Sequence, residues 1–165
     1  MIEKPMRRKD RAMEQERMEA LMQRSTCAIL ATVCEDGTPY AVPVSCVYYN
    51  KAIYFHTAVK GHKVENMEAR PDVSLCMTGD LKVFVDAGKY SHFSSVVVFG
   101  KARLVTDAEE KENALVELMA KYMPAQLPVA RDDARRLDKA VKVFRIDIER
   151  MTGKEKLPYT EEVDR

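Results

Sequence analysis

The sequence has no tryptophan, few cysteines and no long apolar run. Its 165 residues include four Cys, six Gly and seven Pro, and aromatic residues make up 7%. No stretch is as long and apolar as a membrane-spanning helix, and the first residues lack the apolar segment of a secretory signal peptide. We therefore expect a cytoplasmic protein with no membrane partner. The formal net charge of +1 gives no overall electrostatic reason to expect nucleic-acid binding.

The cysteines form no C-x-x-C pair, and each lies in an apolar or alternating segment. They are Cys27, Cys34, Cys46 and Cys76. In a cytoplasmic chain this placement indicates small buried apolar residues rather than disulfides. Their spacing relative to the histidines fits no common zinc pattern, so we predict no metal site.

Apolar residues make up 46% of the chain and charged residues 32%, which is typical of a globular protein. We expect one domain over residues 1–165, because this length suffices to bury a real core. A basic cluster, Arg7 to Lys9 with Arg11, is offset by Asp10, Glu14 and Glu16. It is therefore interpreted as a solvated helix face and not as a nucleic-acid-binding arm.

Alternating and β-branched segments predict six or seven strands. They lie at residues 26–34, 40–49, 52–57, 73–77, 94–105 and 141–148, with a less regular connection through 86–88 and His92. Helical spacing predicts an N-terminal helix over about 10–24, one from about Gly61 to before Pro71, and one from a capping box at 106–109 to Pro124. We expect a single helical turn within 127–139 and a C-terminal tail over about 156–165.

Short turns connect the first strands. Asp36-Gly37 is the signal of a tight hairpin, and Asn50-Lys51 is a second turn. Consecutive strands joined in this way are antiparallel, and no G-x-G-x-x-G motif supports a dinucleotide-binding α/β fold. The order of elements therefore favours a small, mainly β barrel with helices packed outside it. Pro43 cannot donate to a strand ladder, so it marks an edge, a bulge or a ligand-facing stretch.

The helix that starts near Gly61 begins with unusual charges. First helical turns favour acidic residues, because free N–H groups give that end a partial positive charge. Here Lys60, His62 and Lys63 lie at that end, and Thr57 precedes them. Exposed N–H groups, a glycine and two lysines suit a phosphate group, and a solvated basic turn is the alternative interpretation.

Four blocks in this order resemble a known family. They are residues 40–45, 54–63, 95–103 and 146–155. Together they resemble the FMN-binding split β-barrel superfamily of pyridoxamine-phosphate oxidase, and within it the Nim group of nitroimidazole-resistance proteins. The likeness covers roughly residues 10–157. It implies a six- to seven-stranded antiparallel split barrel that forms a homodimer, with FMN in clefts between the two subunits.

The resemblance also implies which residues contact FMN. Backbone of Pro43, Val44 and Ser45 would face the flavin ring, and His56, Thr57 and Ala58 would follow the ring and ribityl chain. His62 and Lys63 would bind the phosphate, in agreement with the charges at the helix start. Four further residues would complete the cleft: Ser94, Ser95, Met151 and Lys154.

His56 corresponds to the Nim histidine on the substrate side of the flavin, so the resemblance makes it the candidate catalytic residue. Its imidazole could donate to a flavin carbonyl or protonate a reduced substrate. Nim-like sequences often carry Arg at the position of Ser94 and an aromatic residue at that of Met151. Neither Ser94 nor Ser95 has an identifiable acid–base partner, so neither is expected to be a nucleophile.

The predicted function is an FMN-dependent oxidoreductase that reduces small acceptors such as nitro compounds, with NAD(P)H or another reductant as donor. Three alternatives remain open at this point. The chain could bind flavin without turnover, as a carrier or sensor. It could oxidise a vitamin B6 phosphate, as pyridoxamine 5'-phosphate oxidase does. A split barrel could also hold haem or a deazaflavin instead of FMN.

Overall fold

The computed structural model describes residues 4–79, 82–84 and 90–156, and the elements below lie within those ranges. The strands are β1 (Ala28–Val33), β2 (Pro39–Val44), β3 (Val47–Tyr49), β4 (Ala52–Ala58), β5 (Asp72–Thr78), β6 (Lys82–Phe84), β7 (Tyr90–Leu104) and β8 (Val141–Lys156). The helices are α1 (Gln15–Arg24), α2 (His62–Ala69), α3 (Ala108–Tyr122) and α4 (Ala130–Leu137), with 3-10 turns η1 (Lys9–Arg11) and η2 (Pro124–Val129).

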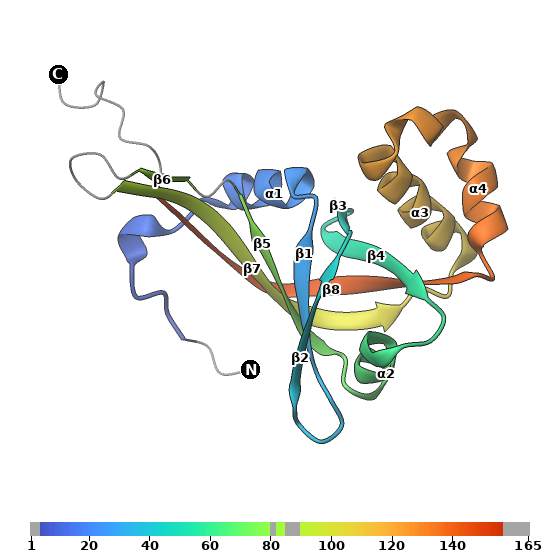
Figure 1. Cartoon of the computed structure of the whole chain (residues 1–165), viewed down its shortest axis with the longest axis horizontal. Helices are drawn as coiled ribbons and strands as arrows, with labels where there is room; N and C mark the ends of the chain where they lie inside the picture. The colour runs from blue at the N-terminus through green and yellow to red at the C-terminus, as the bar shows by residue number, and fades with distance from the viewer. Residues whose placement is uncertain (1–3, 80–81, 85–89, 157–165) are drawn as a thin grey trace.

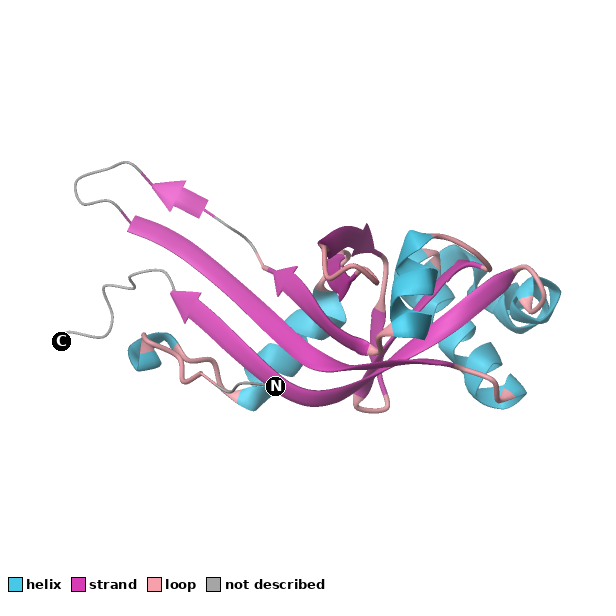
Figure 2. Cartoon of the chain, turned by 90° about the horizontal axis from the view of Figure 1, so that it is seen from below, coloured by secondary structure: helices cyan, strands magenta, loops and turns pink. Residues whose placement is uncertain are grey.

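The strands form an antiparallel sheet with the order β2-β1-β5-β7-β8-β4-β3, and β6 pairs with β7 beside this path. β2 and β3 lie at its two edges, although they are neighbours in sequence (Figure 1). In Figure 2, α3 and α4 lie at one end of the molecule, and the long paired strands β7 and β8 extend toward the other end. The prediction of a mainly β, antiparallel fold with outer helices is confirmed.

The core follows from strand alternation. Along β1 and β5, residues such as Leu30 and Leu75 are fully buried, whereas their neighbours Ile29 and Cys76 are not. Apolar side chains from α1 and α2 cover the buried face, so the main core lies between the sheet and these helices. Fully burying one such aliphatic side chain contributes roughly 1.5–3 kcal/mol.

A second, smaller core holds α3 and α4 against β3, β4 and β8. At the rim of this second core, a polar network joins α3 to β4 and β8. The buried Tyr54 hydroxyl donates to Glu110 of α3 at 2.8 Å, and Arg145 of β8 donates to both the hydroxyl and the carboxylate at 3.0 Å. The position of α3 relative to β4 is therefore fixed by packing and by charge-assisted hydrogen bonds.

The N-terminal helix begins later than predicted, at Gln15 and not near Asp10. Residues 9–11 form only a 3-10 turn, and the next residues pair with β8. Ala12 bridges to Lys154, and the Met13 N–H donates to the Gly153 carbonyl at 3.1 Å. Extended backbone that pairs with a strand cannot also be helical, so tertiary pairing overrides local helical propensity here.

The strand predictions need four corrections. The predicted strand 40–49 is divided into β2 and β3, because the chain leaves the ladder at Ser45 and Cys46. β7 begins at Tyr90, so His92 belongs to a strand and not to an irregular connection. β8 continues to Lys156, the residue at which the predicted tail begins, and the rest of that tail, residues 157–165, lies outside the described ranges. β6, which raises the described strands to eight, was not predicted.

The helix predictions differ in two details. Asp107, and not Thr106, caps α3, because its carboxylate accepts from the Glu110 N–H at 2.7 Å. Residues 130–137 form a helix of two turns, where a single turn was expected. No helix in the described part of the chain is long and apolar enough to cross a membrane.

The cysteine prediction is only partly correct. Cys46 is buried, and burial raises the pKa of its thiol to about 11. Cys27 is exposed, and Cys34 and Cys76 are half-buried, so three of the four are not core residues. Cys27 and Cys34 flank β1 just outside its two ends, and Cys76 alternates with the buried Leu75 and Met77 of β5, a distinction that the apolar character of the segments alone did not reveal.

Candidate functional site

The start of α2 is an open helix end. Its cap residue, Gly61, has φ +141°, a backbone conformation that L-residues rarely adopt. The Gly61 carbonyl accepts from the N–H groups of Val64 and Glu65 at 2.8 and 3.1 Å. The N–H groups of His62 and Lys63 precede these bonds and have no acceptor within the helix. A Cβ built on Gly61 would meet no heavy atom within 4 Å other than its chain neighbours, and Gly61 is exposed, so its backbone is accessible to a ligand.

Two lysines flank this helix end without acidic partners. Lys60 is exposed and Lys63 is half-buried. None of the ion pairs among the described residues involves either side chain. By contrast, Lys142 pairs with Glu68 at the other end of the same helix. Uncompensated cations next to free N–H groups form a surface that favours an anion.

β4 leads directly into this region, and its last residues alternate between two faces. His56 and Ala58 are exposed, whereas Thr57 is 6% exposed and points to the main core. His56 lies opposite Val143 of β8. The three residues predicted to follow a flavin therefore share one strand but not one face, and only His56 and Ala58 present side chains to an external ligand.

The His56 imidazole is accessible to solvent but is surrounded by enough protein to lose part of its hydration. This burial, and next the positive charge of Lys63, hold the pKa of His56 below its usual value. The imidazole is therefore neutral at neutral pH and can donate one hydrogen bond and accept another. The influence of Lys63 also shows that the predicted catalytic histidine and the predicted phosphate ligand lie near each other.

The segment from Pro43 to Ser45 forms the end of an edge strand. Pro43 lies opposite Ile29 of β1, and its missing N–H is not needed on the outer side of β2. Pro43 and Ser45 are exposed, and Val44 is buried. Val47 lies opposite Tyr54 of β4, and Ser45 and Cys46, which have left the strand ladder, connect β2 to this pairing. The edge interpretation of Pro43 is confirmed.

Two residues of α3 hold this segment in place, and no sequence pattern indicated that they would. The Tyr122 hydroxyl accepts from the Cys46 N–H at 2.9 Å and lies 2.9 and 3.0 Å from the carbonyls of Cys46 and Thr26. Lys121 donates to the Cys46 carbonyl at 2.8 Å. Helical spacing indicated only that Tyr122 lies on the apolar face of α3. Its hydroxyl serves as an anchor because the backbone at Cys46 has left the strand ladder.

The remaining predicted ligands lie on the β7–β8 pair and are divided between its two faces. Ser94 shares the core-facing side of β7 with Val96 and lies against Gly79, whose N–H donates to the Ser94 carbonyl. Met151 packs on the same core. Ser95 lies opposite Lys154 on the outer face of the pair.

These residues are far from the start of α2 within one chain. His56 of β4 lies opposite Val143 of β8, and Met151 and Lys154 are eight and eleven residues after Val143 on β8. Roughly 25–35 Å of strand separates them, at about 3.3 Å per residue. Within one chain, the predicted ligands at the end of β4 and the start of α2 therefore lie near one another. Ser95, Met151 and Lys154 lie far from that group.

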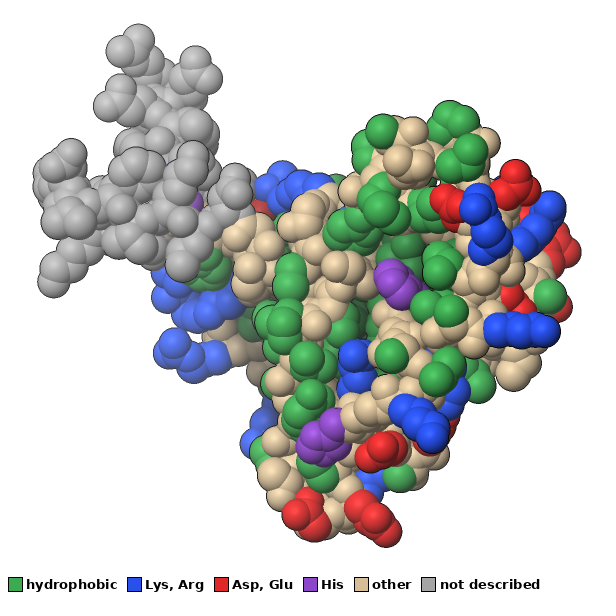
Figure 3. Space-filling model, turned by 45° about the vertical axis from the view of Figure 1, so that its right-hand side comes forward, with side chains coloured by type: hydrophobic (Ala, Val, Ile, Leu, Met, Phe, Trp, Pro, Cys, Tyr) green, Lys and Arg blue, Asp and Glu red, His purple; other side chains and the backbone are tan. Residues whose placement is uncertain are grey.

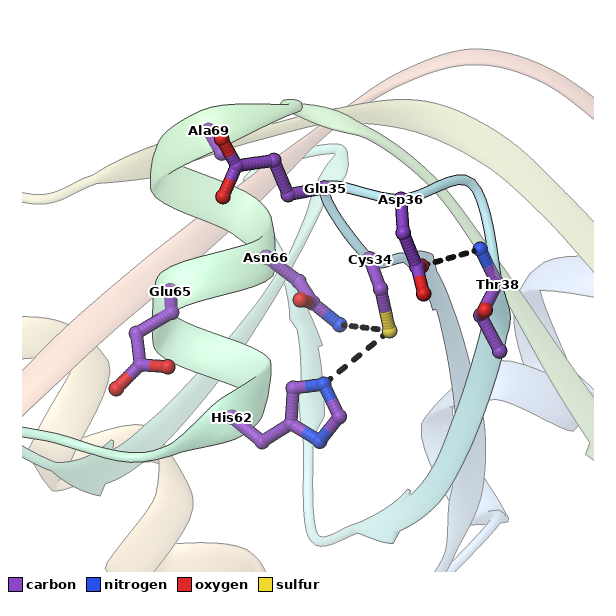
Figure 4. A pocket seen from close by; sticks show the side chains of 8 residues that line it. All are labelled: Cys34, Glu35, Asp36, Thr38, His62, Glu65, Asn66 and Ala69. Carbon is purple, nitrogen blue, oxygen red and sulfur yellow. Dashed lines mark hydrogen bonds between the residues drawn. The ribbon is translucent and has the colours of Figure 1, made fainter.

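The His62 side chain points away from the open helix end. Its ring lies 4.2 Å from the ring of Tyr40, and its Nε2 is 3.2 Å from the Cys34 Sγ (Figure 4). His62 can therefore contribute its backbone N–H to an anion at the helix start, while its imidazole occupies a different depression. Among the described residues, no group of three or more His, Cys, Asp or Glu side chains is arranged to hold a metal ion.

Sequence comparison identifies the family. The sequence profile described as pyridoxamine 5'-phosphate oxidase matches residues 14–155, which is most of the chain. The chain belongs to the pyridoxamine 5'-phosphate oxidase family. A comparison with curated proteins finds no match.

Solved structures agree with this family assignment. A proposed 5-nitroimidazole antibiotic resistance protein from Bacteroides thetaiotaomicron is 25% identical, with a TM-score of 0.76 over 87% of this chain and 86% of that one. An FAD-binding protein from Mesorhizobium loti is also 25% identical, with a TM-score of 0.66 over 89% and 98% of the two chains. The FAD and heme binding protein from Mycobacterium smegmatis shares the fold at 18% identity, with a TM-score of 0.77 over 92% and 75%. The split-barrel fold expected from the sequence is confirmed.

Proposed function

We propose that this family member is an FMN-dependent oxidoreductase that passes electrons from NAD(P)H or another reductant to small acceptors such as nitro compounds. The observation that carries the proposal is the start of α2, where two N–H groups have no acceptor within the helix and two lysines form none of the ion pairs among the described residues. The likeness to a proposed nitroimidazole-resistance protein and to an FAD-binding protein supports a flavin and a nitro acceptor.

The residues at this helix start fit a terminal phosphate. A phosphate monoester carries close to two negative charges near neutral pH and offers three acceptor oxygens. The N–H groups of His62 and Lys63, with the ammonium groups of Lys60 and Lys63, supply matching donors. Gly61 leaves room for the oxygens to approach the backbone. FMN ends in such a monoester, so it matches this site better than a ligand without a terminal phosphate.

The other end of the site would hold the isoalloxazine ring. Tyr122 and Lys121 hold the backbone at Cys46, which directly precedes the pairing of β3 with β4, and Pro43 and Ser45 lie just before it in the chain. When bound, the flavin supplies hydride transfer between a reductant and an acceptor. His56 is neutral because its pKa is lowered, so its role is to donate a hydrogen bond to the ring or the acceptor and to relay a proton.

The proposal includes a homodimer, because one chain does not complete the cleft. Ser95 and Lys154 lie on the outer face of the extended β7–β8 pair, far from the start of α2. In a two-fold dimer the same patch is used twice, so the β7–β8 pair of each copy can lie against the α2 region of the other. Each cleft would then receive the phosphate ligands from one copy and Lys154 from the other.

The outer face of the sheet supports such a dimer. A row of neighbouring residues crosses it in register: Pro43, Ile29, Cys76 and Val97. All are at least partly exposed, and Ile29 is 43% exposed. On the face drawn in Figure 3, apolar side chains gather toward the centre, and most charged side chains lie toward the edges. An apolar centre with a polar rim is typical of subunit interfaces.

The test is a redox cycle on the FMN-loaded protein without oxygen. NADPH or NADH should bleach the visible absorption of the bound flavin, and a nitroaromatic compound should restore it. A chain that binds FMN but shows neither change would be a flavin-binding protein without turnover, and the oxidoreductase proposal would be wrong. Chemical reduction by dithionite, followed by the nitroaromatic compound, separates failure of the donor from failure of the acceptor.

A further inference from the structure

A thiol and an imidazole meet in a depression outside the proposed flavin cleft. Cys34 directly follows β1, and His62 is the first residue of α2. The Cys34 Sγ lies 3.2 Å from the His62 Nε2, within hydrogen-bond distance (Figure 4). The two residues are far apart in sequence and come from different elements, so the fold itself creates this pair.

Two further residues orient the pair. Asn66, one helical turn after His62, is 4% exposed, and its Nδ2 lies 3.0 Å from the Thr32 Oγ1 and 3.6 Å from the Cys34 Sγ. The Tyr40 ring supports the imidazole at a centroid distance of 4.2 Å. A nucleophile, a base within hydrogen-bond distance and groups that orient both form the arrangement that activates thiols in enzymes. The amide N–H of Asn66 can also stabilise a thiolate.

The depression around this pair is open and acidic. It has a volume of about 620 Å³, and Cys34 at its edge is half-buried. Three carboxylate residues line it, Glu35, Asp36 and Glu65, and no lysine or arginine is among its described lining residues. Arg70 donates to the Glu35 carbonyl and acts on Asp36, but the carboxylates outnumber this cation, so the depression favours a neutral or cationic reagent over an anionic one.

We propose that Cys34 is a nucleophilic thiol, activated by His62, that is modified by neutral or cationic low-molecular-mass disulfides. His62 takes the thiol proton, and the sulfur attacks one sulfur of the disulfide. The S–S bond of the reagent breaks, a mixed disulfide forms on Cys34, and the departing thiolate takes the proton from His62. This modification site is separate from the proposed flavin chemistry, since it needs only the thiol, the imidazole and the incoming disulfide.

The other cysteines provide an internal reference. Cys27 is exposed, and its thiol lies 3.8 Å from the carbonyl of the next residue, Ala28. Cys46 is buried, and burial raises the pKa of its thiol to about 11, so it should react slowly. If exposure alone set the rates, Cys27 would react before Cys34.

The experiment treats the full chain with cystamine, a cationic disulfide, and with oxidised glutathione, an anionic one, near neutral pH. Peptide mass spectrometry then follows the mixed disulfide at each cysteine over time. We expect cystamine to modify Cys34 at least roughly tenfold faster than Cys27, because a positioned base accelerates loss of the proton. The preference for cystamine over glutathione should also be larger at Cys34 than at Cys27.

His62→Gln should slow modification of Cys34 by roughly tenfold or more and leave the rate at Cys27 unchanged. Equal rates at Cys34 in the variant and the native chain would overturn the role of His62. If the variant does not fold, the native protein still decides the question. Modification of Cys34 no faster than that of Cys27, or the same reagent preference at both cysteines, would overturn the proposal.

Discussion

Lys63→Ala tests the phosphate site most sharply. The substitution removes a half-buried ammonium group that lies at the start of α2 and that forms none of the ion pairs among the described residues. A hydrogen bond to a charged group is worth about 1.5–3 kcal/mol. The dissociation constant for FMN should therefore rise roughly 10- to 150-fold. We expect the variant to fold, because none of the ion pairs among the described residues is lost with Lys63.

The assay titrates apoprotein with FMN and with riboflavin, and follows the quenching of flavin fluorescence. Riboflavin lacks the phosphate, so its affinity should change by less than about twofold. Lys142→Ala is the matched control, since Lys142 pairs with Glu68 on the same helix but at its far end. It should leave both affinities nearly unchanged. Equal losses for FMN and riboflavin in Lys63→Ala would refute the phosphate assignment.

Two further substitutions test the ring end of the site. His56→Ala should keep most FMN affinity and slow reoxidation of the reduced protein by a nitroaromatic compound roughly 10- to 100-fold, in stopped-flow absorbance. A lower melting temperature with normal turnover per flavin would instead make His56 a structural residue. Tyr122→Phe should reduce the free energy of unfolding by about 1–3 kcal/mol in urea titrations, because the Cys46 N–H loses its acceptor. Unchanged stability and unchanged FMN affinity would show that this anchor is dispensable.

Local signals in the sequence predicted the elements near the site well. The Asp36-Gly37 hairpin joins β1 and β2 as expected, and Gly37 has φ +91°. The strand ending near Thr57 and the helix that starts after Gly61 were predicted, and an edge position was one of the three interpretations given for Pro43. These features depend on turn chemistry, helix-end charges and the missing N–H of proline, which are properties of single residues and their immediate neighbours.

Long-range pairing was beyond the reach of the sequence pattern. β7 and β8 are longer than predicted because they pair with each other over most of their length. Each strand supplies hydrogen-bond partners to segments of the other in which apolar and polar residues do not alternate regularly. The late start of α1 has the same cause, since Met13 pairs with Gly153. Side-chain direction was equally hidden: His62 was selected for its charge, but its ring contacts Tyr40 and Cys34.

The central claim is that FMN binds in a cleft that two copies of the chain complete. Sedimentation velocity of the FMN-loaded protein, recorded at protein and visible flavin wavelengths together, tests it directly. We expect a single boundary at twice 18.8 kDa that carries one flavin per chain. A boundary at 18.8 kDa that carries tightly bound flavin would contradict the shared cleft, and a protein boundary without flavin absorption would contradict FMN binding itself.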